Sequence, residues 1–240
     1  MCKRFGALTV AEKIDFRLEA GARHALIGPN GSGKTTFVNM LTGRIAPTSG
    51  RVLLGGEDVT ALGPAARVRR GLGRTFQINT LFRNILVVDN IALAVAERKG
   101  IAWRMFRAAA QHRDVLDESM ALLETLGLAG DARLQVAGLP YGKQRLVEIA
   151  IALGLRPRVL LLDEPAAGVP SIESHRILEV LDQLPADIAI LIIEHDMDLV
   201  FRFARRLTVL SQGAILTEGT PAEIAADRRV RDVYLGERRA

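Results

Sequence analysis

One segment of eight residues restricts the fold of this 240-residue chain more than any other part of its sequence. It fills the pattern GxxxxGK followed by Ser or Thr at every required position, as Gly28-Pro29-Asn30-Gly31-Ser32-Gly33-Lys34-Thr35. The apolar run Arg23-His24-Ala25-Leu26-Ile27 before it predicts a strand. After Lys34 the pattern is helical, with Phe37 and Met40 on one face and Gly43 as the stop. A strand, a loop and a helix in this order predict a loop that binds phosphate.

The residue types in this loop fit a nucleoside triphosphate with Mg²⁺. Glycine permits the positive φ angles that aim N–H groups at phosphate, and the following helix adds its positive N-terminal end. Lys34 would hold the β and γ phosphates, and Thr35 would place a hydroxyl on Mg²⁺. A glycine-rich turn that binds nothing is the alternative. The predicted nucleotide-binding residues here are Gly28, Pro29, Asn30, Gly31, Ser32, Gly33, Lys34, Thr35 and Thr36.

Two later apolar runs also end in polar residues. Residues 159–162 read as a buried parallel strand that ends in Asp163 and Glu164, at the strand edge where α/β sheets place ligands. Asp163 fits an Mg²⁺ ligand, and Glu164 fits the group that orients and deprotonates an attacking water. Residues 188–193 form a third apolar run, followed by Glu194-His195-Asp196. His195 would sense the γ-phosphate or be structural, and spacing alone leaves both open.

Composition narrows the function classes that remain. No apolar run approaches the roughly 20 residues that a membrane-spanning helix needs, and no secretory signal is recognisable, so a cytosolic protein is expected. The single cysteine, Cys2, excludes an internal disulfide and a cysteine-rich zinc site. The net charge of +5 suits an anionic partner, such as a nucleotide, nucleic acid or a phospholipid surface, without choosing among them.

The order of the motifs resembles that of ABC-transporter ATPases. Between the loop and the second strand lie Gln77 in Arg74-Thr75-Phe76-Gln77 and the segment Leu139, Pro140, Tyr141, Gly142, Lys143 and Gln144. The resemblance implies that Gln77 links Mg²⁺ to the membrane subunit, that residues 139–144 are the signature segment for a partner subunit's ATP, and that His195 is the switch histidine. It also implies that Phe5 stacks on adenine. The expected ligands are thus ATP and Mg²⁺.

The closer resemblance is to the ATPases of branched-chain or other hydrophobic amino-acid uptake. It is carried by residues 73–77, by the Pro-Tyr-Gly form of the signature and by residues 163–168. Residues 233–236 are similar both to that group and to the ATPase of lipopolysaccharide export. The implied activity is ATP hydrolysis coupled to transport. The alternatives are another ABC system, such as lipopolysaccharide export, or a non-transport ABC ATPase, whereas P-loop kinases and GTPases lack the signature.

The implied fold is α/β: a RecA-like P-loop NTPase core with an N-terminal antiparallel β portion and an inserted α-helical subdomain. Residues 1–77 and 157–240 would form the core with a C-terminal helix, and residues 78–156 the subdomain. Helical periodicity at Leu116, Met120 and Leu123, and again at Leu146 and Ile149, agrees with this division. A capping box at residues 220–223 predicts a short helix near the C-terminus.

The resemblance also implies partners. They are a second ABC ATPase subunit in a head-to-tail homo- or heterodimer, two membrane permease subunits and, indirectly, a solute-binding protein; no nucleic acid is expected. The location would be peripheral, on the cytoplasmic face of the cell membrane. Leu81 and Phe82 would anchor a permease helix, although Phe82 also fits an ordinary core residue. The basic, aromatic residues 98–107 fit either a lipid or partner contact or a helix packed inward.

Three features depart from the family pattern. Pro140 and Tyr141 replace the usual serine and glycine, and Lys143 replaces glutamine, so Lys143 would contact phosphate or remain solvated. Pro170 stands where a polar residue normally relays between the two ATP sites. The strand expected before Phe5 is absent from the sequence pattern, because the start is truncated or the strand is dispensable.

Overall fold

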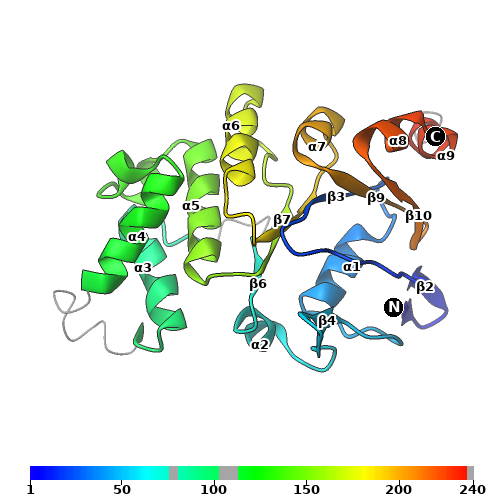
Figure 1. Cartoon of the computed structure of the whole chain (residues 1–240), viewed down its shortest axis with the longest axis horizontal. Coiled ribbons are helices and arrows are strands. Elements are labelled where there is room, and N and C mark those ends of the chain that lie inside the picture. The colour runs from blue at the N-terminus through cyan, green and yellow to red at the C-terminus, as the bar shows by residue number, and fades with distance from the viewer. Residues whose placement is uncertain (76–80, 103–112, 237–240) are drawn as a thin grey trace.

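A six-stranded sheet forms the centre of the computed structural model, which describes residues 1–75, 81–102 and 113–236 (Figure 1). Five strands are parallel, and β10 is antiparallel to its neighbour β9. All residues of β3 and β8 are buried, as expected of parallel strands covered on both faces. In spatial order the strands are β10 (Ala214–Gly219), β9 (Arg206–Ser211), β3 (Arg23–Ile27), β8 (Ala189–Ile193), β7 (Val159–Asp163) and β6 (Leu72–Arg74).

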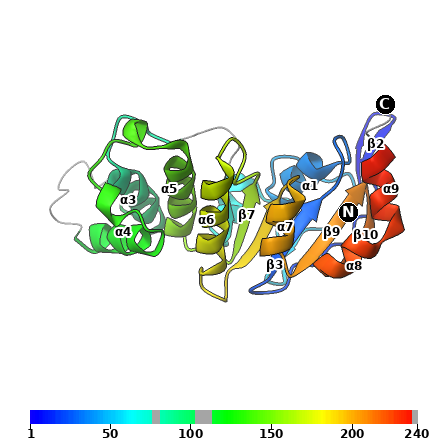
Figure 2. The ribbon, with the colours of Figure 1, turned by 90° about the horizontal axis from the view of Figure 1, so that it is seen from above.

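Helices cover both faces of this sheet, so adjacent residues of a strand pack in two different hydrophobic clusters. Helix α1 (Lys34–Leu41) lies on one face, and α6 (Ser171–Asp182) and α7 (Met197–Phe203) lie on the other (Figures 1 and 2). On β3, Leu26 packs in the cluster that contains Phe37 and Met40 of α1, whereas Ala25 packs in the cluster that contains Val200 of α7. The predicted strands and the helix after the glycine-rich loop are confirmed.

Two short antiparallel hairpins lie outside the main sheet. Strands β1 (Lys3–Phe5) and β2 (Leu8–Ala11) form the first, and β4 (Leu53–Leu54) and β5 (Glu57–Asp58) form the second. Helix α2 (Pro64–Val68) follows the second hairpin. The α/β fold with an N-terminal antiparallel portion is thus confirmed. The prediction that no strand precedes Phe5 is wrong, because Phe5 ends β1, a strand of three residues.

Among the described residues, three helices form a lobe at one end of the molecule (Figure 2). They are α3 (Val87–Arg98), α4 (Arg113–Thr125) and α5 (Tyr141–Gly154), with 3-10 turns η3 (Ala129–Asp131) and η4 (Val136–Gly138) between α4 and α5. The helices predicted from Leu123 and from Leu146 are α4 and α5, and both residues are buried in the larger core cluster. The limits of residues 78–156 for a subdomain stay a prediction.

The C-terminal part ends in α8 (Pro221–Ala226) and α9 (Arg228–Gly236). The predicted capping box is confirmed, since the Thr220 hydroxyl accepts a hydrogen bond from the backbone N–H of Glu223 and the Glu223 carboxylate accepts one from the N–H of Thr220. Within the described residues, no helix combines the length and the apolar character required to cross a membrane.

Candidate nucleotide site

The order of the strands brings the predicted site residues to one edge of the sheet. Ile193, the last residue of β8, lies opposite Leu26 of β3 on one side and Asp163 of β7 on the other. The glycine-rich loop, the two carboxylates and His195 therefore follow three neighbouring parallel strands at their carboxyl ends. That edge is where open α/β sheets bind ligands.

The loop between β3 and α1 depends on its glycines. Gly28, Gly31 and Gly33 have φ angles of 150°, 74° and 103°, in the region that disfavours other residues. A Cβ atom on Gly33 would lie 2.8 Å from the carbonyl oxygen of Val10 in β2. The loop is thus fixed against the N-terminal hairpin, and its residues Asn30 and Gly31 are exposed.

Several hydrogen-bond donors lie in this loop or next to it. Gly33 caps α1 without a side-chain hydrogen bond, and the first-turn N–H groups of any helix lack partners within the helix. The Nζ atom of Lys34 donates to the carbonyl oxygens of Gly28 and Pro29, at 2.6 and 2.9 Å. The hydroxyl of Ser32 is buried and has no hydrogen-bond partner among the described residues. This arrangement suits a phosphate chain, which would accept from these groups.

Asp163 ends β7 and already has a cationic neighbour. The Nη2 atom of Arg74, at the end of β6, lies 2.9 Å from Asp163 Oδ2, and both side chains are about nine-tenths buried. Thr35, in the first turn of α1, is exposed. A carboxylate and a hydroxyl are the hard oxygen donors that Mg²⁺ prefers, and they leave room for phosphate oxygens and water. The donor set fits Mg²⁺. Gln77, the third predicted metal ligand, lies outside the described residues.

Glu164 has an unusual backbone, with φ of 48° in a residue that is not glycine. Its N–H donates to the carbonyl oxygen of Ile193 at 2.9 Å, which holds the strained turn onto β8. Such strain persists where the surroundings enforce it and occurs often in active sites. The Oε1 atom of Glu164 lies 3.7 Å from Nδ1 of His195, whose side chain is 70% exposed. The two residues face the same space, where an attacking water and a γ-phosphate would meet.

A buried carboxylate that the sequence did not single out supports this pair. Glu194 is 2% exposed and accepts hydrogen bonds from the N–H groups of Ala166 and His195, at 3.2 and 3.3 Å. Burial raises the pKa of Glu194, and these hydrogen bonds oppose that effect. Glu194 therefore ties the turn after Glu164 to the residue that carries the candidate switch histidine. A carboxylate directly after a wholly apolar strand was the available signal.

The signature segment does not lie at the chain's own glycine-rich loop. It opens α5, which lies beside α6 and on the other side of β7 from α1 (Figures 1 and 2). Pro140 caps the helix, and Leu139 is buried with its carbonyl oxygen accepting from Gln144 Nε2 at 2.8 Å. Gly142 is pressed against Glu173 so closely that a Cβ atom there would collide with the carboxylate.

The two unusual residues of this segment have partners within the chain. Lys143 Nζ lies 2.7 Å from Asp131 Oδ2, so in this state the lysine forms an ion pair, neither of the two arrangements expected from the sequence. The Tyr141 hydroxyl accepts from Arg145 Nη2 at 2.7 Å, and a Cβ atom on Gly168 would lie 3.3 Å from the Tyr141 ring. Tyr141 thereby connects α5 to the loop after β7. Pro170 caps α6, and its carbonyl oxygen accepts from the N–H of Glu173.

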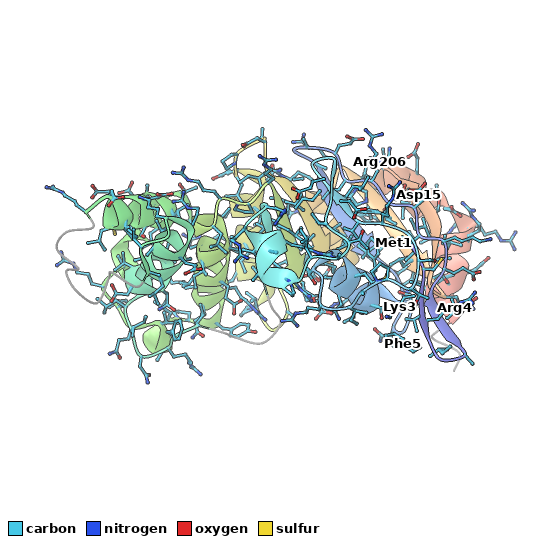
Figure 3. All side chains as sticks on the ribbon, turned by 90° about the horizontal axis from the view of Figure 1, so that it is seen from below. Met1, Lys3, Arg4, Phe5, Asp15 and Arg206 are labelled. Carbon is cyan, nitrogen blue, oxygen red and sulfur yellow. The ribbon has the colours of Figure 1, made fainter. Side chains whose placement is uncertain are left out.

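Phe5 lies on the N-terminal hairpin together with Lys3 and Arg4 (Figure 3). Its ring is 49% exposed, and Lys3 Nζ lies 4.9 Å from the ring centre. Strand β2 pairs with this strand and also contacts the glycine-rich loop through Val10. A half-exposed aromatic ring on a hairpin that contacts the loop suits a purine base.

The fold and this site define a P-loop nucleotide-binding cassette. A family model described as "ABC transporter" matches residues 11–167, and a second, described as "Branched-chain amino acid ATP-binding cassette transporter", matches residues 214–240. The chain belongs to the ABC-transporter ATPase family.

The sequence similarity to known proteins extends over nearly the full length of this chain. The chain is 37% identical to the "High-affinity branched-chain amino acid transport ATP-binding protein LivG" of Escherichia coli, over 98% of this chain and 94% of that protein. It is 31% identical to the "Probable branched-chain amino acid transport ATP-binding protein LivG" of Archaeoglobus fulgidus, over 98% and 93%. The crystal structure of the ADP conformation of MJ1267, an ATP-binding cassette of an ABC transporter, superposes with a TM-score of 0.86 at 29% identity, covering 98% of this chain and 96% of that one.

Proposed function

We propose that this chain is the ATP-binding and ATP-hydrolysing subunit of an ABC transporter that imports branched-chain or other hydrophobic amino acids. One observation carries the ATPase activity: the glycine-rich loop, two adjacent carboxylates and a histidine follow three neighbouring strands at one sheet edge. The amino-acid class rests on the names of the relatives and on the C-terminal family match.

The loop residues bind the nucleotide through its phosphates. Lys34 exchanges the carbonyl oxygens of Gly28 and Pro29 for β- and γ-phosphate oxygens, and the N–H groups of the loop and of α1 donate to the same chain of oxygens. Phe5 stacks on adenine. Thr35, Asp163 and Gln77 would hold Mg²⁺, which when bound would neutralise part of the charge of the phosphates.

Glu164 acts as the general base. Its carboxylate accepts a proton from a water that attacks the γ-phosphorus, the bond to the β-phosphate oxygen breaks, and ADP and phosphate leave. His195 contacts the γ-phosphate and keeps the water in line, since it lies 3.7 Å from Glu164. Glu194 holds both residues in place by its hydrogen bonds to the backbone of Ala166 and His195.

The site is completed by a second, related ATPase subunit in a homo- or heterodimer. The signature residues lie away from the chain's own loop, so they serve the ATP of the partner in a head-to-tail pair. Gly142 and the N-terminus of α5 offer N–H groups to that γ-phosphate. The dimer docks on two membrane permeases at the cytoplasmic face, and a solute-binding protein acts through those permeases.

Two substitutions test the assignment. Glu164→Gln keeps the shape of the side chain but removes the base, so Mg²⁺-dependent ATP hydrolysis should fall by about 100-fold or more while ATP binding persists. Lys34→Ala removes the charge that faces the phosphates and should weaken ATP binding itself by about tenfold or more. Phosphate release and calorimetry separate the two effects. Full turnover by Glu164→Gln would sink the general-base role, and unchanged ATP affinity of Lys34→Ala would contradict the phosphate role.

A further inference from the structure

A buried ion pair joins the candidate metal ligand to the strand that leads to Gln77. Arg74 ends β6, Asp163 ends β7, and their side chains are 9% and 11% exposed at an N–O distance of 2.9 Å. The same guanidinium donates through Nη1 to Asn39 Oδ1 at 2.9 Å, on α1. Arg74 is therefore held by two elements that also carry the phosphate loop and the Mg²⁺ ligand.

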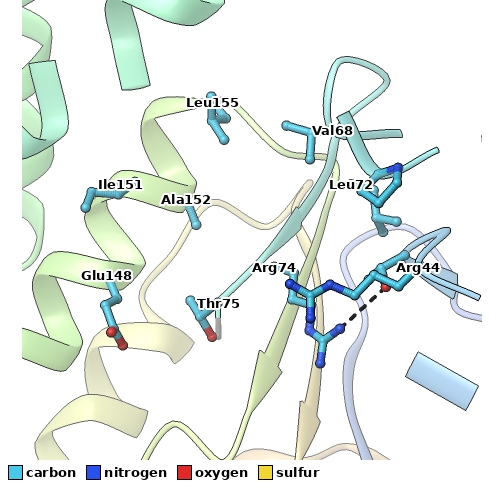
Figure 4. Close-up of a pocket in the computed structure, with 11 residues that line it drawn as sticks. Arg44, Val68, Leu72, Arg74, Thr75, Glu148, Ile151, Ala152 and Leu155 are labelled. Atoms are coloured by element: carbon cyan, nitrogen blue, oxygen red, sulfur yellow. Dashed lines mark hydrogen bonds between the residues drawn. The ribbon is translucent and has the colours of Figure 1, made fainter. Parts of the chain in front are cut away.

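A second buried carboxylate faces the same space as Arg74. Arg74 and Thr75 line one side of a pocket of about 180 Å³, and Glu148, Ile151 and Ala152 of α5 line the other side (Figure 4). The Glu148 side chain is 7% exposed; its Oε2 accepts from Arg145 Nη1 at 2.8 Å. Its Oε1 is buried without a hydrogen-bond partner among the described residues. Burial raises the pKa of Glu148 although Arg145 opposes this, so another cation would stabilise the carboxylate.

We propose that Arg74 is a two-position cation that neutralises Asp163 in the nucleotide-free subunit and turns into the pocket toward Glu148 Oε1 when a divalent cation arrives with the nucleotide. This inference rests on the proposed function, since it takes Asp163 as the metal ligand. It assigns Arg74 and Glu148 positioning roles outside the catalytic residues. It also connects the metal site to α5, the helix that begins with the signature segment.

Electrostatics gives the direction of the effect. A guanidinium beside Asp163 cancels the negative charge that a divalent cation requires and repels the cation itself, at low exposure where solvent screens little. The phosphates of a nucleotide restore negative charge at the site, so metal binding becomes dependent on nucleotide. Once Arg74 has turned, its contact with Glu148 Oε1 replaces the ion pair with Asp163. This contact is favourable because a buried polar atom without a hydrogen-bond partner is costly.

Mn²⁺ binding measured by electron paramagnetic resonance tests the proposal without relying on turnover. The probe is Mn²⁺ titrated into the full chain saturated with ADP, after ADP affinity without metal has been determined with a fluorescent analogue. Arg74→Gln should tighten Mn²⁺ by about fivefold or more, because a repelling charge is lost. Glu148→Gln should weaken it by about threefold, because the turned arginine loses its partner.

A double variant tests the connection between the two residues. In the Arg74→Gln background, Glu148→Gln should leave Mn²⁺ affinity unchanged, which a merely structural role would not produce. Arg70→Gln is the matched control, since Arg70 forms an exposed ion pair with Glu57 away from Asp163. If Arg74→Gln does not fold, Arg74→Lys, which keeps the charge but cannot bridge Asp163 and Asn39 together, should show a smaller tightening.

Failure of the proposed function and failure of this inference give different experimental results. A chain that binds no ADP fails the proposed function. A chain that binds ADP, yet has the same Mn²⁺ affinity in the wild type and in the folded Arg74 variant, overturns the inference alone. Equal weakening by Glu148→Gln in both backgrounds overturns the second position of Arg74.

Discussion

At the scale of single residues, His24 shows how burial next to the phosphate loop links stability to pH. His24 lies on β3 and is 4% exposed, and its Nε2 lies 2.8 Å from the Thr208 hydroxyl. The Thr208 hydroxyl donates to Glu218, so it accepts from His24. Burial, with a smaller contribution from the charge of Arg206, lowers the pKa of His24 to about 4.

This lowered pKa predicts a loss of stability in mild acid. As pH falls from about 6.5 toward about 4, the unfolded chain binds a proton at His24 that the folded chain does not, so unfolding becomes easier. The expected contribution is about 2 kcal/mol between about pH 7.5 and about pH 5. Urea denaturation of wild type and His24→Gln at both pH values measures it. The same pH dependence in both proteins would contradict the assignment; His175→Gln, at a half-buried histidine on α6, is the control.

At the scale of elements, the turn before α3 presents an aromatic ring to solvent. Phe82 is 62% exposed, so the interpretation of Phe82 as a core residue is wrong, and Leu81, expected to be an anchor, is instead buried in the core at 8% exposure. The Asn90 side chain accepts from the N–H of Phe82 and donates to the carbonyl oxygens of Phe82 and Leu86. Asn90 is itself buried, so it fixes the turn and holds Phe82 outward.

Alanine substitutions of the adjacent residues Leu81 and Phe82 form a matched pair of variants. Phe82→Ala should leave the melting temperature unchanged and weaken association with permease-containing membranes by about 30-fold, the effect of losing an anchor worth about 2 kcal/mol. Leu81→Ala should instead destabilise the subunit by about 2 to 4 kcal/mol, because it opens a cavity in the core. Thermal melting and membrane flotation give both readouts. Normal flotation of Phe82→Ala would remove Phe82 from the docking surface.

The elements near the site were predictable from local pattern, whereas the contacts between them were not. Strands β3, β7 and β8 are apolar runs that end at the candidate site residues, and a local pattern suffices for such strands. The partners of Arg74, Lys143 and Glu194 lie on other elements, so no periodicity indicates them. Leu81 and Phe82 are both apolar and adjacent, so the sequence pattern does not indicate which one is buried. Asn90, eight residues further along the chain, holds the backbone of Phe82. Gln77 and residues 103–107 of the predicted basic, aromatic segment lie outside the described residues.

At the scale of the whole molecule, the signature helix and the phosphate loop of one subunit are separated by the strand order of the sheet. Helix α5 belongs to the helical lobe, on the side of β6 and β7, whereas α1 follows β3, and β8 lies between β3 and β7. A single subunit therefore cannot close its own site by a local rearrangement. Under the proposed function two subunits assemble upon ATP binding, so a variant that binds ATP without hydrolysing it should accumulate as the assembled form.

If the subunits assemble in this way, a carboxylate placed in the first turn of α5 should have a favourable effect within its own subunit and an unfavourable effect between subunits. Tyr141 is 39% exposed in the first turn of α5, where a carboxylate is favourable for its own helix by about 0.5 kcal/mol. Between subunits the same carboxylate would face the γ-phosphate of the partner and repel it. In the Glu164→Gln background with ATP, sedimentation should therefore show a dimer that Tyr141→Asp reduces by about tenfold or more. Tyr141→Phe, which loses the same hydrogen bond from Arg145 without adding a charge, is the control and should keep the dimer. Lys34→Ala should also reduce the dimer at an ATP concentration that just saturates the parent chain, because the variant then binds less ATP. If Glu164→Gln stays monomeric with saturating ATP and dimerises only with a second ATPase subunit, the pair is a heterodimer. If Tyr141→Asp dimerises normally in the homo- or heterodimer that forms, the signature segment does not face the partner's phosphate.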